Sequence, residues 1–292
     1  MKNKIAYIIC LVLFSINASF AQLNPLTAQY YTNTYLANPA FAGYNQGLNI
    51  NASCRAQWTR IPGSPVVQNL TADYGTEKVG IGLNINFDKA GLQRQSRVVG
   101  TYAYHLKLND TDKALHFGLS VGFMQQRLSQ QDIVGNVNDP LAMNYNQRQT
   151  YIDGDFGLGY TSNQFRFEAS LPNLNTFTKR DEIRVADVGT FYAAVSYKID
   201  LSTGTEGIDL EPKFAYRGIK GMDNMWDFGT QLSLANKQVN LTGMYHSNKS
   251  ASFGLGLDYR KRFLINGFYT TQTSALTSYS NGSFELNIRG RF

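Results

Sequence analysis

The chain alternates apolar and polar residues with a period of two along most of its length. In residues 79–87 every second side chain is apolar and those between are Gly or Asn. The same pattern fills residues 114–124 and recurs in 151–160, 164–171, 226–234 and 252–259. A period of two is that of a β-strand with unlike faces, and no helical period appears after residue 21. The pattern predicts about 14 strands of about 9–11 residues, the length of a tilted membrane-spanning strand.

Four short turns predict the register of neighbouring strands. Two-residue turns at 76–77, 162–163 and 236–237, and a slightly longer turn at 108–113, join alternating segments. The cross-strand pairs that these turns predict are Tyr74–Val79, Tyr160–Phe165, Leu234–Val239 and Tyr104–Phe117. Apolar residues face apolar residues in all four, whereas a slip of one residue would send one strand's apolar set to the opposite face.

Short turns alternate with longer connections along the chain. The longer ones are 57–65, 88–94, 127–151, 173–187, 218–224, 246–250 and 272–282. Short turns at one rim and longer loops at the other are typical of transmembrane barrels, in which the short turns are periplasmic. The segment 200–208 is long for a periplasmic turn. A soluble β-sandwich is the alternative fold, but it would rarely show this asymmetry so regularly.

The chain ends on a strand with one apolar and one polar face, SFELNIRGRF. Phe284, Leu286 and Ile288 would face lipid, and Phe292 would mark the periplasmic interface. We expect this strand to pair with the first strand, residues 47–56, because closure leaves no unpaired edge. The predicted fold is therefore all-β, a transmembrane antiparallel up-and-down β-barrel.

The first 21 residues have the pattern of a secretory signal peptide. A short basic segment is followed by an apolar run at residues 5–16, and small residues stand at Ser19 and Ala21. The run is too short to span a bilayer, so we expect cleavage before Gln22. Cys54 is then the only mature cysteine, and no disulfide can form within the chain. The expected location is the cell outer membrane.

Domain organisation follows from these boundaries. Residues 1–21 form the signal peptide, 22–45 an N-terminal segment that is either periplasmic or plugs the lumen, and 46–292 the barrel. The 26 Gly residues fall largely on the inward face of the strands, where they leave room for whatever the lumen holds. The formal net charge of +6 falls to +4 without Lys2 and Lys4, and this dispersed excess argues against nucleic acid as a partner.

Candidate chemistry is sparse. The Gly-x-Gly triplets lie within strands and lack the following helix of a nucleotide site. His105 and His116 should face each other in the lumen, where a hydrogen-bonded pair is favoured over a metal site because no third ligand is near. With three His in the chain, no Ser–His–carboxylate set can be placed from sequence. We expect no enzyme activity and no cofactor.

The segment after the signal peptide carries the most specific motifs. They are Gln29–Tyr30, Asn38–Pro39–Ala40, Gly43, Arg55, Gln57–Trp58, Gly63 and Pro65. In this order and spacing, the chain resembles the PorP/SprF family of type IX secretion outer-membrane proteins of Bacteroidetes. The resemblance runs from about residue 22 to the end and is clearest before residue 175.

The resemblance implies a role without catalysis. Some members of that family belong to the core secretion machinery and contact its periplasmic ring. Others export or anchor a secreted surface protein, such as a gliding adhesin, through its type IX C-terminal domain. By family frequency the second kind is favoured. The implied partners are that surface protein, other type IX secretion components of the periplasm and outer membrane, and outer-membrane lipid.

The motif residues from Asn38 to Pro65 are the candidate partner-binding set. Trp58 offers a large amphipathic surface and Arg55 a forked donor. Alternatively, Trp58 belongs to the outer aromatic girdle and Arg55 to lumen packing. Two other functions remain open: a porin or hydrophobic-substrate channel, which predicts an open lumen, and an outer-membrane lipid hydrolase, which predicts a Ser–His pair at the lipid-facing rim.

Overall fold

The computed structural model describes most of the chain after residue 28. The described residues are 29–58, 63–108, 112–129, 132, 143, 145–146, 150–178, 190–202, 207–220, 223–271 and 281–292. The expected signal peptide, the first part of the N-terminal segment and much of loops 127–151, 173–187 and 272–282 lie outside these residues. No helix in the described part is long and apolar enough to cross a membrane.

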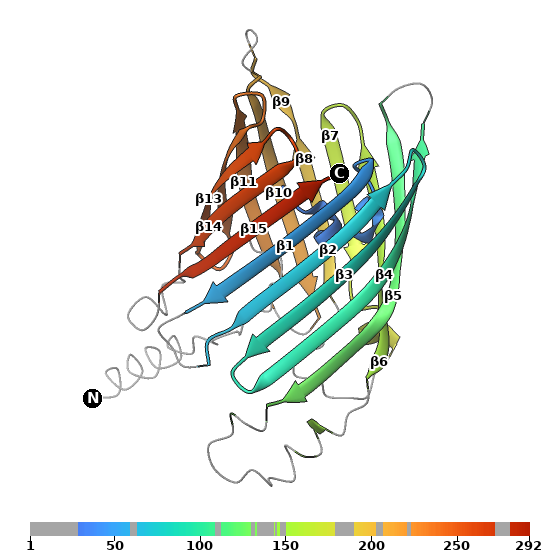
Figure 1. Ribbon diagram of the computed structural model, residues 1–292, viewed down its shortest axis with the longest axis vertical. Helices are drawn as coiled ribbons and strands as arrows, with labels where there is room; N and C mark the ends of the chain where they lie inside the picture. The colour runs from blue at the N-terminus through green and yellow to red at the C-terminus, as the bar shows by residue number, and fades with distance from the viewer. Residues whose placement is uncertain are drawn as a thin grey trace, which may run out of the picture.

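The described strands form one closed antiparallel barrel (Figure 1). They are β1 (Gly47–Gln57), β2 (Val66–Gly75), β3 (Val79–Ala90), β4 (Gln93–Lys107), β5 (Ala114–Leu128), β6 (Tyr151–Thr161), β7 (Phe165–Leu171), β8 (Thr190–Tyr197), β9 (Ile199–Asp200), β10 (Asp209–Ile219), β11 (Met225–Leu234), β12 (Val239–His246), β13 (Ala251–Tyr259), β14 (Phe263–Thr270) and β15 (Ser283–Arg291). Because β8 and β9 both pair with β10, they count as one strand interrupted at Lys198. The described barrel therefore has 14 strands, as the alternation predicted.

The terminal strand closes the barrel as predicted. β15 pairs with β1 over nine residue pairs, from Asn49–Arg291 to Gln57–Ser283. Phe284 points outward and is 51 % exposed, and Phe292 lies at the end of the strand beside Leu48. Closure satisfies the backbone of both end strands, so neither is left as an open edge.

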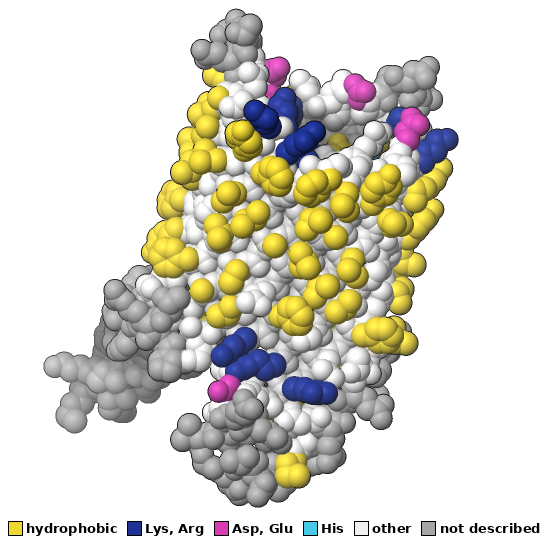
Figure 2. Space-filling view, viewed as in Figure 1, with side chains coloured by type: hydrophobic (Ala, Val, Ile, Leu, Met, Phe, Trp, Pro, Cys, Tyr) yellow, Lys and Arg dark blue, Asp and Glu magenta, His cyan; other side chains and the backbone are white. Residues whose placement is uncertain are grey.

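The outer wall is apolar and the inner wall is polar. Outward residues such as Ile152, which is 64 % exposed, form a belt around the barrel, and Lys and Arg gather above and below it (Figure 2). Inward positions carry Asn, Thr, Ser and charged residues that are buried. A soluble protein buries its apolar face, so this inverted arrangement is that of a membrane barrel.

Two of the four predicted registers are confirmed and two are wrong by two residues. Leu234 pairs with Val239 and Tyr104 with Phe117, as predicted. Tyr74 pairs with Ile81 instead of Val79, and Tyr160 with Phe167 instead of Phe165. A shift of two keeps the apolar face outward, which is why the alternation alone could not detect it.

The shifted hairpins share a local cause, a hydroxyl residue at the start of the turn. Thr76 N donates to Val79 O at 2.8 Å and Ser162 N donates to Phe165 O at 2.7 Å, and both hydroxyls bond within the same turns. Thr76 and Ser162 are thereby the first residue of the turn, and the two central residues follow them. Ser and Thr commonly form such side-chain turns.

One predicted long connection is a tight turn. β3 continues to Ala90 and β4 begins at Gln93, so the segment 88–94 is mostly strand. Gly91, with φ of 56°, supplies the left-handed residue that the turn needs. At the rim that holds the C-terminus the β11–β12 turn (235–238) is short, whereas the β9–β10 connection (201–208) is long, as its length in the sequence indicated (Figure 1). At the opposite rim the β12–β13 connection (247–250), which was expected to be long, is as short as the β11–β12 turn. The expected division into short and long connections is therefore only partly kept.

The orientation of the barrel can be tested by cysteine labelling. We expect Asp223→Cys, in the connection between β10 and β11, to react with a membrane-impermeant maleimide on intact cells. Asn236→Cys, in the short turn between β11 and β12, should react only after the cells are permeabilised. Both variants carry Cys54→Ala, because Cys54 is an exposed free thiol. Labelling of residue 236 on intact cells would reverse the assigned orientation.

Candidate functional site

The described part of the N-terminal segment, from residue 29, lies inside the barrel. Residues 29–46 contain a short helix, α2 (Thr34–Ala37), and a 3-10 turn, η1 (Pro39–Phe41), which Figure 1 shows within the ring of strands. Tyr30 is 0 % exposed and Phe41 is 2 % exposed. We call residues 29–44 the plug, since their contacts are with the inward wall.

Two asparagines shape the plug and attach it to the wall. The Asn33 side chain accepts from Leu36 N at 3.2 Å and caps α2. The Asn38 Oδ1 accepts from Ala40 N at 2.9 Å, and its Nδ2 donates to Leu158 O and Ala169 O at 2.8 and 3.1 Å. Pro39 follows as the first residue of η1, where a missing N–H costs nothing. The Asn-Pro-Ala motif is therefore a buried anchor to β6 and β7.

Glycines of the inner wall let the plug backbone approach closely. A Cβ added to Gly118 would collide with Pro39 C and Ala40 N, and one added to Gly157 would collide with the Asn38 side chain. Gly43 has φ of 66°, and its N–H donates to Asp73 Oδ2 at 3.0 Å. Glycine weakens a strand interior, but at these positions its missing side chain lets the plug lie directly against the strand backbone.

Tyr30 ties the plug to two buried charges. Its carbonyl accepts from Lys213 Nζ at 2.9 Å, and its hydroxyl donates to Asp227 Oδ2 at 2.5 Å. Lys213 also forms an ion pair with Glu168 at 2.8 Å. Burial raises the pKa of the Tyr30 phenol above its usual value, so the hydroxyl stays protonated and remains a donor.

Asp227 is a shared acceptor for groups on different strands. Besides Tyr30, it accepts from Arg217 Nη2 at 2.7 Å and from His246 Nδ1 at 2.6 Å. His246 Nε2 in turn shares a hydrogen bond of 2.7 Å with Ser252 Oγ. One carboxylate therefore links the plug with β10, β11, β12 and β13.

The order Ser252–His246–Asp227 has the connectivity of a hydrolase triad. Ser252 is only 1 % exposed, however, and its Oγ also bonds Thr270 Oγ1 at 2.7 Å. The set faces the lumen and not the lipid-facing rim, where the hydrolase alternative placed its Ser–His pair. The set is enclosed in the lumen and, through Asp227, bonds the plug residue Tyr30.

The paired histidines also hold the plug. His105 and His116 face each other across β4 and β5, as predicted, with 2.8 Å between their Nδ1 atoms. His105 Nε2 lies 3.1 Å from Ala42 O, which can only accept, so Nε2 carries the hydrogen and Nδ1 accepts from His116. Among the described residues no group of three or more His, Cys, Asp or Glu side chains could hold a metal ion.

The other end of the barrel is partly covered by the chain after β7. Arg97 forms ion pairs with Asp153 and Asp155 at 2.9 and 2.6 Å. Asp155 also accepts from Asn173 N at 3.0 Å, and Leu174 N donates to Gly154 O at 2.8 Å. Residues 172–174 are thereby held against β6, and the helix α4 (Asn175–Thr178) follows them.

The structure divides the nine candidate partner-binding residues between two places. Asn38, Pro39, Ala40 and Gly43 belong to the plug and are buried. Arg55 also faces the lumen, directly opposite Glu285 of β15, which accepts from the plug residue Gln29 at 2.6 Å. These five residues contact the chain itself, so a partner could reach them only after the plug moves.

The other four residues lie at the rim with the longer connections. Gln57 N donates to Pro65 O at 3.0 Å, and Trp58 N donates to Gly282 O at 3.3 Å. Gly63, with φ of 73°, accepts from Gly91 N at 2.8 Å. The first loop is thus fastened to the β3–β4 turn and to the start of β15, and Trp58 and Pro65 are half-buried there.

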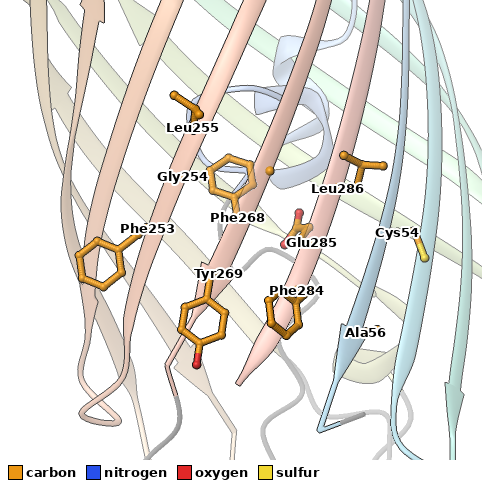
Figure 3. Close-up of a pocket in the computed structure, with 11 residues that line it drawn as sticks. Cys54, Ala56, Phe253, Gly254, Leu255, Phe268, Tyr269, Phe284, Glu285 and Leu286 are labelled. Atoms are coloured by element: carbon orange, nitrogen blue, oxygen red, sulfur yellow. The ribbon is translucent and has the colours of Figure 1, made fainter. Parts of the chain in front are cut away.

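The lipid-facing wall carries a shallow apolar groove. It has a volume of about 700 Å³ and includes Gly267, which stands between Leu255 and Leu286 in the cross-strand row and leaves a gap there. The exposed residues Leu255 and Leu286 line the groove together with Cys54 (Figure 3). The inward residue Glu285, which accepts from the plug residue Gln29, is also among its lining residues.

These features can be compared with known proteins. The family model for type IX secretion system membrane protein PorP/SprF matches residues 19–289. The chain belongs to this family. The resemblance drawn from the N-terminal motifs is thereby confirmed, and the family is one of secretion-system barrels and not a known enzyme family. A comparison with curated proteins found no match.

Two solved structures are similar to this chain. The outer membrane protein Omp33 of Acinetobacter baumannii matches with a TM-score of 0.51 at 9 % identity, over 86 % of this chain and 100 % of that one. A mutant porin of Rhodopseudomonas blastica matches with a TM-score of 0.37 at 8 % identity, over 85 % and 99 % of the two chains. At these identities the likeness to Omp33 concerns the fold alone, which is that of an outer-membrane β-barrel.

Sequence reasoning missed the charged anchors of the PorP/SprF plug. Lys213, Glu168 and Asp227 are far from the N-terminal motifs in the sequence, and only barrel closure brings them to Tyr30. A signal was nevertheless present, because all three occupy inward positions of alternating strands. A charged residue inside a barrel needs a buried partner or water.

The fit between plug and wall predicts the effect of adding a side chain at Gly118. Gly118→Val should displace Pro39 and Ala40, expose the plug to protease and raise single-channel conductance in planar bilayers. Val suits a strand, so the barrel itself should still form. The matched control is Gly267→Ala, because an added Cβ there has no atom within 4 Å. Unchanged conductance and protease protection in Gly118→Val would contradict the plug assignment.

The role of Asp227 predicts a graded loss of stability. Asp227→Ala removes the shared acceptor of three donors and should lower the free energy of unfolding by about 3–5 kcal/mol, because it leaves Arg217 buried without its ion pair. Tyr30→Phe removes one hydrogen bond to the carboxylate and should lower it by about 1.5–3 kcal/mol. Urea unfolding in lipid vesicles, followed by heat-modifiable gel mobility, measures both. Equal losses would contradict the shared-acceptor arrangement.

Proposed function

We propose that this PorP/SprF protein exports or anchors one secreted surface protein through contacts at its outer rim. The observation that carries the proposal is the plug. Its backbone and side chains occupy the lumen and bury the polar inner wall. A barrel of this family with a filled lumen acts through its surfaces.

The burial of the lumen argues against the porin alternative. In a porin the polar inner residues line a water-filled channel. Here, inward residues from strands all around the barrel, such as Asn51, Thr71, Ser120, Lys213 and Asn287, are buried. Two of these residues bond the plug directly, since Thr71 accepts from Asn33 at 3.0 Å and Lys213 donates to Tyr30 O at 2.9 Å. At these positions plug groups take the place of channel water.

The proposed contact surface combines the first loop with the neighbouring chain at the same rim. Trp58 is a large amphipathic residue held at φ of 50°, and its backbone is tied to Gly282. Binding surfaces commonly centre on such aromatic anchors, because they bury a large area with little conformational entropy. The loops at this rim, which tolerate sequence change, would set which surface protein is bound.

Membership in the family supports the choice of partners. A type IX secretion membrane protein works with the secretion components and with their cargo, and we propose the C-terminal domain of the secreted protein as the bound part. Periplasmic components would meet the opposite rim, which carries the short turns and the C-terminus.

Deletion of the gene tests the proposal. We expect one surface protein to disappear from the cell surface or to be released into the medium, while uptake of small solutes stays unchanged. Surface proteomics and antibiotic sensitivity measure the two effects. A full surface proteome together with loss of solute uptake would favour the channel function instead.

A rim variant separates the contact surface from the fold. Trp58→Ala should release the surface protein into the medium while the barrel remains heat-modifiable. The matched control is Trp226→Ala, which removes the other Trp of the chain, an outward residue at the start of β11 that packs beside Tyr245 at 5.9 Å. Loss of the surface protein in both variants would point to a general folding defect.

A further inference from the structure

A turn with three consecutive cations lies at the C-terminal rim. Arg260, Lys261 and Arg262 join β13 to β14, and all three are exposed. The backbone of Arg262 accepts from Arg291 N at 2.8 Å, so the turn lies beside the end of the terminal strand. By the assigned orientation this rim is periplasmic.

Turn geometry does not account for these residues. Arg260 and Lys261 have φ of 54° and 56°, the left-handed conformation of a two-residue hairpin turn. Asn and Gly are preferred there, because in other residues the Cβ atom crowds the backbone carbonyl oxygen. Lys237 and Lys249 of other turns also have positive φ, so the distinctive feature of this turn is its run of three cations.

The charges of the turn have no acidic partner in the described part of the chain. Three carboxylates of this rim form ion pairs with other cations, in the pairs Glu77–Lys107, Asp258–Arg289, Asp209–Lys198 and Asp209–Lys237. None of the described carboxylates forms an ion pair with Arg260, Lys261 or Arg262. The turn is therefore a local excess of three positive charges.

Aromatic residues fix the depth of the turn in the membrane. Tyr259 is 65 % exposed, and the Arg260 guanidinium lies 5.2 Å from the centre of its ring. Phe263 and Phe292 form an edge-to-face pair 6.0 Å apart on the other side of the turn. Girdles of aromatic residues mark the two membrane interfaces of such barrels. A turn that directly follows Tyr259 and precedes Phe263 is therefore expected at the level of the lipid headgroups.

We infer that the Arg260–Arg262 turn binds the anionic headgroup of a phospholipid in the periplasmic leaflet. Arg offers forked donors to a phosphate and Lys a point charge. An acidic surface of a periplasmic protein is the competing occupant. The lipid is favoured because the turn follows the aromatic belt directly, with no intervening stalk that would lift the charges away from the membrane.

Lipid retention on the purified full-length barrel tests this inference. Wild-type protein in mixed phosphatidylcholine and phosphatidylglycerol nanodiscs should retain phosphatidylglycerol preferentially by native mass spectrometry. The variant Arg260→Asn/Lys261→Gly/Arg262→Ser keeps residues that suit the turn. At roughly fivefold per cation, its preference should fall by up to about a hundredfold. Added salt should weaken the wild-type preference, since it screens exposed charges.

A neighbouring turn provides the matched control. Lys237→Gly, next to Asn236 in the β11–β12 turn, also removes a cation at positive φ from the same rim. Lys237 already has an ion pair with Asp209 at 3.3 Å, so this variant should keep the preference for phosphatidylglycerol. An unchanged preference in the triple variant, or none in the wild type, would overturn the inference. Loss of co-purified periplasmic proteins without any lipid preference would assign the turn to a protein partner instead.

Discussion

A polar inner wall must find hydrogen-bond partners, and this constraint organises the whole molecule. In a wide barrel, water supplies these hydrogen-bond partners, whereas here the plug supplies several of them. The Asn38 amide bonds backbone carbonyls of β6 and β7, and Tyr30 joins Lys213 to Asp227. If the plug were withdrawn, these buried groups would lose their partners unless water entered. Plug and wall are therefore complementary halves of one polar core.

The same constraint explains a wall that is poor in strand-forming residues. Gly weakens a strand interior because it packs no side chain and loses much entropy on folding. At Gly118 and Gly157 that weakness is offset by close contact with the plug, since a single Cβ would occupy the space of Pro39 or Asn38. Outside the barrel, Gly267 has no such neighbour. Inward and outward glycines thus serve different purposes in the same sheet.

The filled lumen leaves the two rims as the parts available to other molecules. One rim carries the first loop, in which Trp58 and Gly63 are held by backbone hydrogen bonds to β15 and to the β3–β4 turn. The other rim carries short turns, the C-terminus and the Arg260–Arg262 cations. The two proposals assign one role to each rim: the rim with the first loop would hold a surface protein, and the rim with the C-terminus would contact lipid. Both roles rest on surfaces and neither needs a channel.

The sequence by itself determined the architecture, because strand periodicity is a local property. The alternation predicted a membrane barrel and its strand number. The apolar face of the last strand predicted that the barrel closes, and the motifs from Gln29 to Pro65 indicated the family. The alternation did not determine the register at every turn, since a two-residue shift at Thr76 or Ser162 leaves every side chain on the same face.

Only the tertiary structure decided what the motifs do. Asn38–Gly43 and Arg55 turned out to be buried, and Gln57–Pro65 stayed at the rim, although all belong to one sequence signature. The anchors Lys213 and Asp227 lie 183 and 197 residues from Tyr30 along the chain and meet it only when the barrel closes. His246 joins them through its hydrogen bond to Asp227. Such contacts form between inward residues that lie at the same height along the barrel axis. Strand register and barrel closure set that height, and neither can be derived from local sequence patterns.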